Sequence, residues 1–344
     1  MKISQLMIAK GFGGAERYFV DLSLSLAAQG HQVQVICHKQ FTGRTKLDNK
    51  SNVQLQKFSV AGWWDVIARN GIEKSIVAFA PDIIHAHLAR GAYIAGKISK
   101  HTGTPLVVKT HNYVKLKYYK HVDKFLPTTI DQQEYLIEKG INPENIRTIP
   151  NFSSIPPVAE LTKIADDQPG IICALGRMVR KKGFDVLIKA IKKVTEQGLD
   201  VILYLGGDGP ERNKLQQLCS DLGLDKKVIF TGWVDNVCSF LQDATLFVLP
   251  SFDEPFGIVV LEAMSQGKAI ISTPTQGPCE ILDDQTAWFA ETGNIDSLAD
   301  SIITAINNEE MRMYKAQNAL DKFKDSYSQA QVVPKIVRVY QELV

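Results

Sequence analysis

The chain has 344 residues, which is enough for two α/β domains of ordinary size, and 45% of them are apolar, as in a globular protein. No run of 18 apolar residues occurs, so no membrane-spanning helix is predicted, and the N-terminal stretch is expected to form a strand and a glycine loop rather than a signal peptide. The five cysteines form no Cys-x-x-Cys pair, which predicts neither a disulfide framework nor a zinc site and favours the cytoplasm.

The net charge is only +2, but the charge is divided unevenly along the chain. Residues 1–150 contain 20 Lys and Arg and 11 Asp and Glu, a net charge of +9, which leaves −7 for the remainder. A basic first half favours an anionic partner on that side, although a chance distribution of surface charge is an open alternative.

Strands and helices alternate through the first 150 residues. A strand at 3–9 leads into a glycine loop with Gly13 and Gly14 and then into a helix at 15–29. This loop lets backbone approach an anion, but its spacing is not Gly-x-Gly-x-x-Gly, so the dinucleotide fingerprint of a dehydrogenase is absent. Further strands are predicted at 32–37, 53–58, 82–86, 106–109, 125–129 and 146–149, with helices at 64–79, 92–100 and 132–139. This rhythm predicts a parallel, doubly wound sheet with ligands at the carboxyl ends of its strands.

Two of those strand ends carry histidines. His85 and His87 share one face of a strand, where they are either metal ligands or structural residues. His111 follows the next strand, directly before a loop. Residues 115–124 then mix Lys, Tyr and His, which indicates either contact with an anionic lipid headgroup or a solvated face with two core tyrosines.

The proline-containing stretch 152–169 is predicted to link two domains, and a second α/β series starts at a strand over 171–175. Four cations, two of them Arg177 and Lys182, occupy the loop between this strand and a helix at 184–197. Like charges packed together favour a bound anion, and Arg and Lys are the usual phosphate ligands, whereas the alternative is a basic surface loop. Later strands are predicted at 201–205, 228–231, 245–249 and 269–272, with helices at 235–241 and over 296–343.

The stretch 250–267 organises the second half. Glu254 lies in a polar loop after a buried strand, and Glu262 follows in an apolar helix that Gly257 opens. The N-terminus of such a helix, at Phe256, Gly257 and Ile258, is a phosphate site, and carboxylates beside it suit the hydroxyls of a ribose and a sugar. The alternative is a solvated loop glutamate and a partly exposed helix glutamate.

This stretch, SFDEPFGIVVLEAM, resembles the Glu-x7-Glu signature of retaining glycosyltransferases of the GT-B fold, family 4. Residues 176–183, with the pattern G-R-x4-K-G, resemble the motif that holds the donor diphosphate in that family, and G-G-A-E at 13–16 resembles its first loop. The sequence departs from the family at Asn112, where Asp is common, and at Pro278, where a second Gly is usual.

The resemblance implies two Rossmann-like, doubly wound domains facing across a cleft, with an acceptor-binding domain over 1–152 and a nucleotide-sugar-binding domain over 153–328. A last helix at 329–344 is expected to pack back on the first domain. The resemblance also implies the site. Arg177 and Lys182 would hold the diphosphate, Glu254 the sugar and Glu262 the ribose, and His111 would act at the sugar or acceptor side. The loop at Gly13 and Gly14 would face the diphosphate, and Gly207 and Val234 would line the nucleotide pocket.

The expected reaction is the transfer of a hexose from a UDP-sugar or GDP-sugar, UDP being favoured, to an acceptor hydroxyl with retention and without a covalent nucleophile. No cofactor and no metal are expected, because the cationic loop replaces Mg²⁺ and the chain has no Asp-x-Asp. The acceptor is expected to be a lipopolysaccharide, glycolipid or other cell-envelope glycan, met in the cytoplasm with peripheral contact to an anionic membrane, and no nucleic acid is expected. An epimerase or hydrolase on the same fold, and a non-catalytic binding subunit, are the alternatives.

Overall fold

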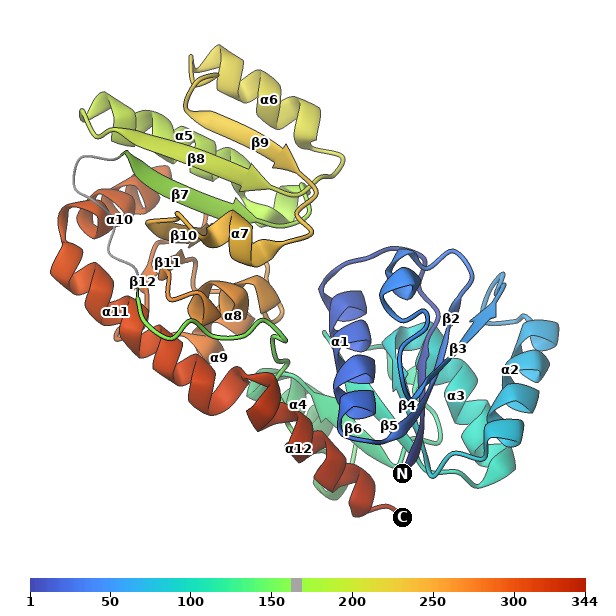
Figure 1. Ribbon diagram of the computed structural model, residues 1–344. Coiled ribbons are helices and arrows are strands. Elements are labelled where there is room, and N and C mark those ends of the chain that lie inside the picture. Colours follow the sequence, from blue (N-terminus) through green and yellow to red (C-terminus); the bar gives the residue numbers. More distant parts are fainter. Residues whose placement is uncertain (162–168) are drawn as a thin grey trace. The chain divides into compact units, whose positions relative to one another are not determined.

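The computed structural model describes residues 1–161 and 169–344, and the chain forms two compact units (Figure 1). Unit 1 comprises Met1–Ser154 together with Gln329–Val344, and unit 2 comprises Ile155–Ser328. The change of unit therefore falls between Ser154 and Ile155, close to the start of the proline-containing stretch, whose residues 162–168 lie outside the described part of the chain. The final segment belongs to unit 1, although it follows unit 2 in the sequence.

Unit 1 is built on a six-stranded sheet in which every strand pair is parallel. Its strands, in the spatial order β3-β2-β1-β4-β5-β6, are β1 (Lys2–Met7), β2 (Gln32–His38), β3 (Val53–Phe58), β4 (Ile83–His87), β5 (Leu106–Thr110) and β6 (Lys124–Pro127). The chain winds outward from β1 to β3 and then returns to the other side of β1 as β4. The strand order therefore reverses between β1 and β4, which is where doubly wound sheets bind ligands.

The helices of unit 1 are α1 (Gly14–Ala28), α2 (Val66–Phe79), α3 (Leu88–Thr102), α4 (Ile130–Glu138) and α12 (Gln329–Gln341). Helices α2 and α3 cover the face of the sheet that presents Leu6, Ile84 and Val108, whereas Tyr340 of α12 reaches side chains of the opposite face. Alternation along the strands places Gln5, His85 and Lys109 on this second face, so one side of the sheet is apolar and the other is partly polar.

Unit 2 repeats the same plan with a second six-stranded parallel sheet. Its strands, in the spatial order β12-β11-β10-β7-β8-β9, are β7 (Gly170–Leu175), β8 (Val201–Gly206), β9 (Val228–Gly232), β10 (Leu246–Leu249), β11 (Ala269–Ser272) and β12 (Trp288–Phe289). The strand order reverses between β7 and β10. Both faces of this sheet are apolar, with alternate residues of β7 and β10 in two separate core clusters.

The helices of unit 2 are α5 (Phe184–Glu196), α6 (Arg212–Asp221), α7 (Val237–Leu241), α8 (Ile258–Ser265), α9 (Gln276–Ile281), α10 (Ile295–Asn307) and α11 (Glu309–Lys322), the last followed by a π-helical turn at Phe323–Tyr327. Helices α5 and α10 bury apolar stripes against one face of the sheet, and α8 covers the other. The expected alternation of strands and helices and the doubly wound α/β fold are confirmed.

The structure differs from the predicted elements in a few places. Residues 146–149 form a single bridge from Ile146 to Phe125 instead of a strand, although Ile149 also donates a backbone hydrogen bond to Pro127. The helix predicted from 64 begins at Val66, because the Asp65 side chain accepts a hydrogen bond from Ala68 and caps the helix. The sequence pattern does not predict α6, α9 or the two-residue strand β12.

Candidate active site

The loops that follow β7 and β10 meet at the carboxyl edge of the sheet in unit 2. The loop after β7 passes through a 3-10 turn at Arg180–Lys182 and ends at Gly183, which has φ +65°. A Cβ atom at Gly183 would lie 2.0 Å from the carbonyl oxygen of Pro250, so only glycine permits this close approach. The backbone amide of Phe252 also donates a 2.8 Å hydrogen bond to the carbonyl of Lys181. Backbone contact therefore holds the two predicted site loops side by side.

This contact brings the cations of one loop next to the acids of the other. The ammonium of Lys182 pairs with the carboxylate of Glu254, and both side chains are largely buried, 14% and 11% exposed. Lys181 pairs with Asp253 at 3.2 Å, but both of those side chains are about half exposed, so their pairing contributes little. Arg177 is exposed at the surface of the same loop. The structure thus joins Lys182 and Glu254 directly and places Arg177 in the same loop.

The turns after β8 and β9 complete this edge of the sheet. Gly207 has φ +116°, and a Cβ atom on it would lie 2.0 Å from the carbonyl oxygen of Gly176, so the β8 turn packs directly on the loop that carries Arg177. The amide of Gly207 donates a 2.6 Å hydrogen bond to Gly232, which ends β9 two residues before the half-buried Val234. Gly207 and Val234 therefore lie at the same sheet edge as Arg177.

The loop after β10 delivers Glu254 to the start of α8. Gly257 caps the helix in a left-handed conformation, and its amide and those of Ile258 and Val259 occupy the first turn without a side-chain cap. Phe256 is buried, and Gly277 of α9 packs on its backbone so closely that a Cβ there would lie 2.2 Å away. Pro278, where the family usually has glycine, is accommodated inside α9. Glu262 lies within α8 and is 1% exposed, so its carboxylate is enclosed rather than solvated.

In unit 1 the predicted glycine loop follows β1 and begins α1. The Glu16 carboxylate accepts a 3.1 Å hydrogen bond from the Gly13 amide and thereby caps the start of α1. Gly13 and Gly14 are exposed, and a Cβ atom at Gly13 would meet only the Glu16 carboxylate, at 3.2 Å.

The histidines at the ends of β4 and β5 form one cluster. The rings of His85 and His87 stack with their centroids 4.4 Å apart, and Nδ1 of His87 lies 3.3 Å from Nε2 of His111. Tyr18 of α1 packs edge-on against His111 at 5.3 Å. Burial, with a smaller contribution from the Lys109 charge, lowers the pKa of His111 to about 3 and therefore favours a neutral imidazole. Within residues 1–161 and 169–344, no group of three or more His, Cys, Asp or Glu side chains is arranged to hold a metal ion.

Lys109 is a component of this cluster that sequence reasoning did not select. Its side chain is fully buried, its ammonium donates to the carbonyl of Ile149, and it lies 5.4 Å from the centre of the Tyr18 ring. Burial lowers the pKa of this ammonium well below the usual range for lysine. The available signal was a lysine that continues the apolar run Leu106–Val108 of a central strand.

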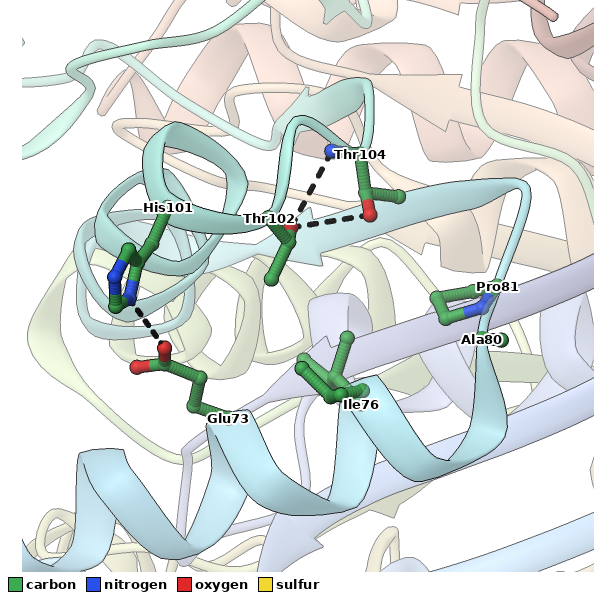
Figure 2. Close-up of a pocket in the computed structure, with 8 residues that line it drawn as sticks. Glu73, Ile76, Ala80, Pro81, His101, Thr102 and Thr104 are labelled. Carbon is green, nitrogen blue, oxygen red and sulfur yellow. Dashed lines mark hydrogen bonds and ion pairs between the residues drawn. The ribbon is translucent and has the colours of Figure 1, made fainter.

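A shallow hollow elsewhere in unit 1 is distinct from these residues (Figure 2). It lies between the C-terminal ends of α2 and α3, where His101 Nδ1 and Glu73 Oε1 are 2.6 Å apart and Thr102 and Thr104 share a hydrogen bond. This position is at the amino ends of β4 and β5, opposite to the edge at which doubly wound sheets bind ligands. None of the predicted site residues lines it.

Two doubly wound sheets in one chain, with a cation-and-carboxylate loop pair at the reversal point of the second, define the class of two-domain, doubly wound α/β proteins. The family model for glycosyl transferases group 1 matches residues 162–322, and the model for glycosyltransferase family 4 matches residues 12–153. The chain belongs to the group 1 glycosyltransferases, and it is therefore a transferase of glycosyl groups.

Two proteins of Rhizobium meliloti are similar along most of their length. The lipopolysaccharide core biosynthesis glycosyltransferase LpsD is 30% identical over 295 residues, 84% of each chain. Its counterpart LpsE is 27% identical over 333 residues, 95% of each chain.

Solved structures support the same fold. Anabaena HepE in complex with UDP and glucose superposes with a TM-score of 0.84 at 20% identity, covering 99% of both chains. The apo form of the lipopolysaccharide outer core galactosyltransferase WaaB gives a TM-score of 0.74 at 20% identity over the full length of both chains. These structures confirm the expected GT-B fold.

Proposed function

We propose that this glycosyltransferase moves a hexose from a UDP-sugar to a hydroxyl of a lipopolysaccharide core or related cell-envelope glycolipid, with retention at the anomeric carbon and without a metal ion. The observation that carries the donor assignment is the contact between the Arg177–Lys182 loop and the Glu254 loop at the reversal point of the unit 2 sheet. A reversal point with cations and an uncapped helix N-terminus is suited to a diphosphate.

The chemistry follows from where charge develops. Departure of the nucleoside diphosphate leaves negative charge on its phosphate oxygens, and the cations of Arg177 and Lys182 and the first-turn amides of α8 stabilise that charge. Lys182 is held in place by Glu254, so its ammonium is positioned before the donor binds. Glu254 contacts the sugar hydroxyls, Glu262 the ribose, and Gly207 and Val234 border the nucleoside. The leaving phosphate accepts the proton of the attacking hydroxyl on the same face of the sugar.

The acceptor assignment rests on the net charge of the first half of the chain and on the similarity to other glycosyltransferases. Residues 1–150 carry a net charge of +9, which favours a phosphorylated or otherwise anionic acceptor in unit 1. The similarity to LpsD and LpsE of Rhizobium meliloti supports a lipopolysaccharide core acceptor, and the similarity to HepE supports UDP as the nucleotide of the donor. In this proposal His111 holds the transferred sugar or the acceptor, and Gly13 and Gly14 approach the diphosphate.

Contact with an anionic membrane surface extends the acceptor proposal. The segment from Ile83 to Val122 contains no Asp or Glu and seven Lys and Arg, of which only Lys109 is buried, and Lys97 and Lys117 lie over the rings of Tyr93 and Tyr118. Trp63, half exposed, packs edge-on against Tyr93 at 5.9 Å, beside the exposed Trp64. Exposed tryptophan among lysines suits the headgroup region of an anionic bilayer. Tyr119, in contrast, is a core residue. No helix in the described parts of the chain has both the length and the apolar character to span a bilayer.

Calorimetric titration of the full chain with UDP and with GDP, each with and without EDTA, tests the donor assignment. We expect UDP to bind, to bind equally in EDTA, and to lose affinity in Arg177→Ala. The matched control is Arg180→Ala, a cation of the same loop for which the family resemblance implies no role. Equal losses of UDP affinity in both variants would show that Arg177 contributes only to the general positive charge of the loop. Binding of GDP but not of UDP would contradict the choice of UDP.

Product analysis tests the reaction itself. With UDP-hexose and a lipopolysaccharide core acceptor, NMR of the product should show the anomeric configuration of the donor. Release of free sugar without a glycosylated product would contradict transfer and favour the hydrolase alternative.

Sedimentation with vesicles tests the membrane contact. Vesicles containing phosphatidylglycerol should carry down the protein, and phosphatidylcholine vesicles should not. Trp64→Ala should weaken this binding, whereas Trp233→Ala, which removes a comparably exposed tryptophan of unit 2, should not. Equal binding to both vesicle types would remove the electrostatic part of the proposal.

A further inference from the structure

The polar face of the unit 1 sheet contains an unbroken line of hydrogen-bonding side chains that ends at His111. We call Gln5, His85, His87 and His111 the histidine chain. Gln5 of β1 is the register partner of His85 on β4, and His87 lies two residues further along the same strand. Gln5, His85 and His87 have no exposed surface. Such buried polar groups are retained only where they satisfy one another or serve a function.

The distances indicate a direction for the chain. Nε2 of His87 lies 2.8 Å from Oε1 of Gln5, and an amide oxygen is only an acceptor, so His87 carries its proton on Nε2. Burial lowers the pKa of His87 well below the usual range, which keeps the imidazole neutral and leaves its Nδ1 as an acceptor. The neighbour of that Nδ1 is Nε2 of His111, at 3.3 Å, so the proton of His111 must also lie on Nε2.

The contacts at the far end of the chain agree with this orientation of the Gln5 amide. The amide nitrogen of Gln5 lies 3.4 Å from Nδ1 of His85 and 3.4 Å from the Tyr340 hydroxyl, and that hydroxyl lies 2.5 Å from the same His85 nitrogen. With Tyr340 donating to His85 and Gln5 donating to both, the Gln5 oxygen is directed at His87. Reversal of the amide would reverse the proton positions on both His87 and His111.

We propose that Gln5 and His87 are positioning residues that hold His111 as the tautomer protonated on Nε2, so that its Nδ1 accepts a hydrogen bond from a sugar or acceptor hydroxyl. The buried Nδ1 of His111 has no hydrogen-bond partner in the described structure. Tyr18, packed edge-on against the ring, restricts its rotation. The opposite tautomer would present a donor in place of an acceptor at that atom. The part of this inference that concerns the hydroxyl rests on the proposed function.

The tautomer can be measured directly in the full chain. Long-range proton–nitrogen NMR on protein labelled with ¹⁵N-histidine distinguishes the two tautomers, and His111→Asn assigns the His111 signals. We expect one neutral tautomer with the proton on Nε2, both at His87 and at His111. If His111 of the unaltered protein were protonated on Nδ1, this measurement alone would overturn the proposal.

Variants test whether Gln5 and His87 set this state. Gln5→Met removes the acceptor at nearly constant volume, and His87→Phe removes both ring nitrogens and keeps the ring contacts. Each should give a mixture of His111 tautomers. Gln5→Glu retains an acceptor for His87 and should therefore keep the single His111 tautomer. Val339→Ala is the control for a disturbed core, because it truncates a buried side chain of α12 and removes no hydrogen bond of the histidine chain. An unchanged His111 signal in Gln5→Met and His87→Phe would overturn the positioning role.

Kinetics separate this inference from the proposed function. Gln5→Met should lower kcat about tenfold, the equivalent of one hydrogen bond to the transition state, with little change in UDP affinity. A purely structural role would lower the melting temperature and leave kcat of the folded enzyme unchanged, which would overturn the link to the substrate. Failure of UDP binding or transfer in the unaltered protein would instead count against the proposed function, while the NMR result would still decide the tautomer.

Discussion

The two sheets have the same strand order but differ in the side chains that fill their second face. In unit 2 both faces are apolar, and the charged groups of the candidate site lie on loops that glycines such as Gly183 hold together. In unit 1 one face carries Gln5, His85 and Lys109 inside the core, and burial shifts the titratable groups among them toward their neutral forms. Unit 2 therefore carries its charge on loops at the edge of its sheet, whereas unit 1 suppresses charge beside His111. This difference suits a diphosphate on one unit and neutral hydroxyls on the other.

The largest expected effect tests the charge of unit 2. Lys182→Ala should lower kcat/KM with a UDP-sugar by about 10²–10³-fold, because it removes a cation aimed at the developing phosphate charge and leaves Glu254 without its partner. Lys193→Ala is the control, since Lys193 pairs with Asp296 at the surface of α5, outside the loops of the site. Similar losses in both variants would argue against a specific role for Lys182.

The second test concerns how the loops of unit 2 are joined. Gly183→Ala should lower the free energy of unfolding by about 3 kcal/mol, because the new Cβ meets the Pro250 carbonyl and the residue is left-handed. Gly198→Ala has a similar backbone conformation, φ +86°, but open space around the Cβ, so it should cost only about 1 kcal/mol. Urea unfolding of the three proteins measures the difference. Equal costs would show that backbone contact between the loops is unimportant.

The third test uses the suppressed charge of unit 1. Burial lowers the pKa of Lys109, so between the folded pKa and about 10.4 the unfolded chain binds a proton that the folded chain does not. Lys109 should therefore contribute a rise in stability with pH through this interval, of up to about 1.4 kcal/mol per pH unit, whereas the buried thiols of Cys37, Cys173 and Cys219, whose pKa burial raises, act in the opposite sense in every variant. At pH 7.5, Lys109→Met should have a larger free energy of unfolding than the unaltered protein. This free energy should rise less with pH in the variant, and the difference between the two proteins should shrink toward pH 10.

Urea unfolding of the unaltered protein and of Lys109→Met from pH 7.5 to 9.5 measures the difference between their slopes. Lys100→Met, at an exposed position of α3, is the control and should leave the slope unchanged. A Lys109→Met variant with the full slope of the unaltered protein would show that Lys109 is protonated in the folded state.

The contrast between the units also explains what the sequence could predict. Period-two and helical patterns predicted both sheets, and the glutamates, Arg177 and Lys182 were identifiable because their motifs are local and contiguous. The pairing of Lys182 with Glu254 was not predicted, because the two residues are 72 positions apart and meet through the backbone contacts of Gly183 with Pro250 and of Lys181 with Phe252. The histidine chain was missed for the same reason. Gln5 and His87 are 82 residues apart, and nothing in the pattern around Gln5 indicates that they share a face.

The smallest expected effect concerns the end of the histidine chain. Tyr340→Phe removes a hydroxyl that is 2.5 Å from Nδ1 of His85 and leaves that buried nitrogen with only the longer contact to Gln5. The expected cost is about 1–2 kcal/mol of the free energy of unfolding, the penalty for one poorly satisfied buried acceptor. Val339→Ala, a truncation on the same helix that removes no hydrogen bond, separates general loosening of α12 from loss of the hydroxyl. If Tyr340→Phe lowered kcat while His111 kept its single tautomer, the path from α12 to the site would have to run through Tyr18 or Lys109 instead of Gln5.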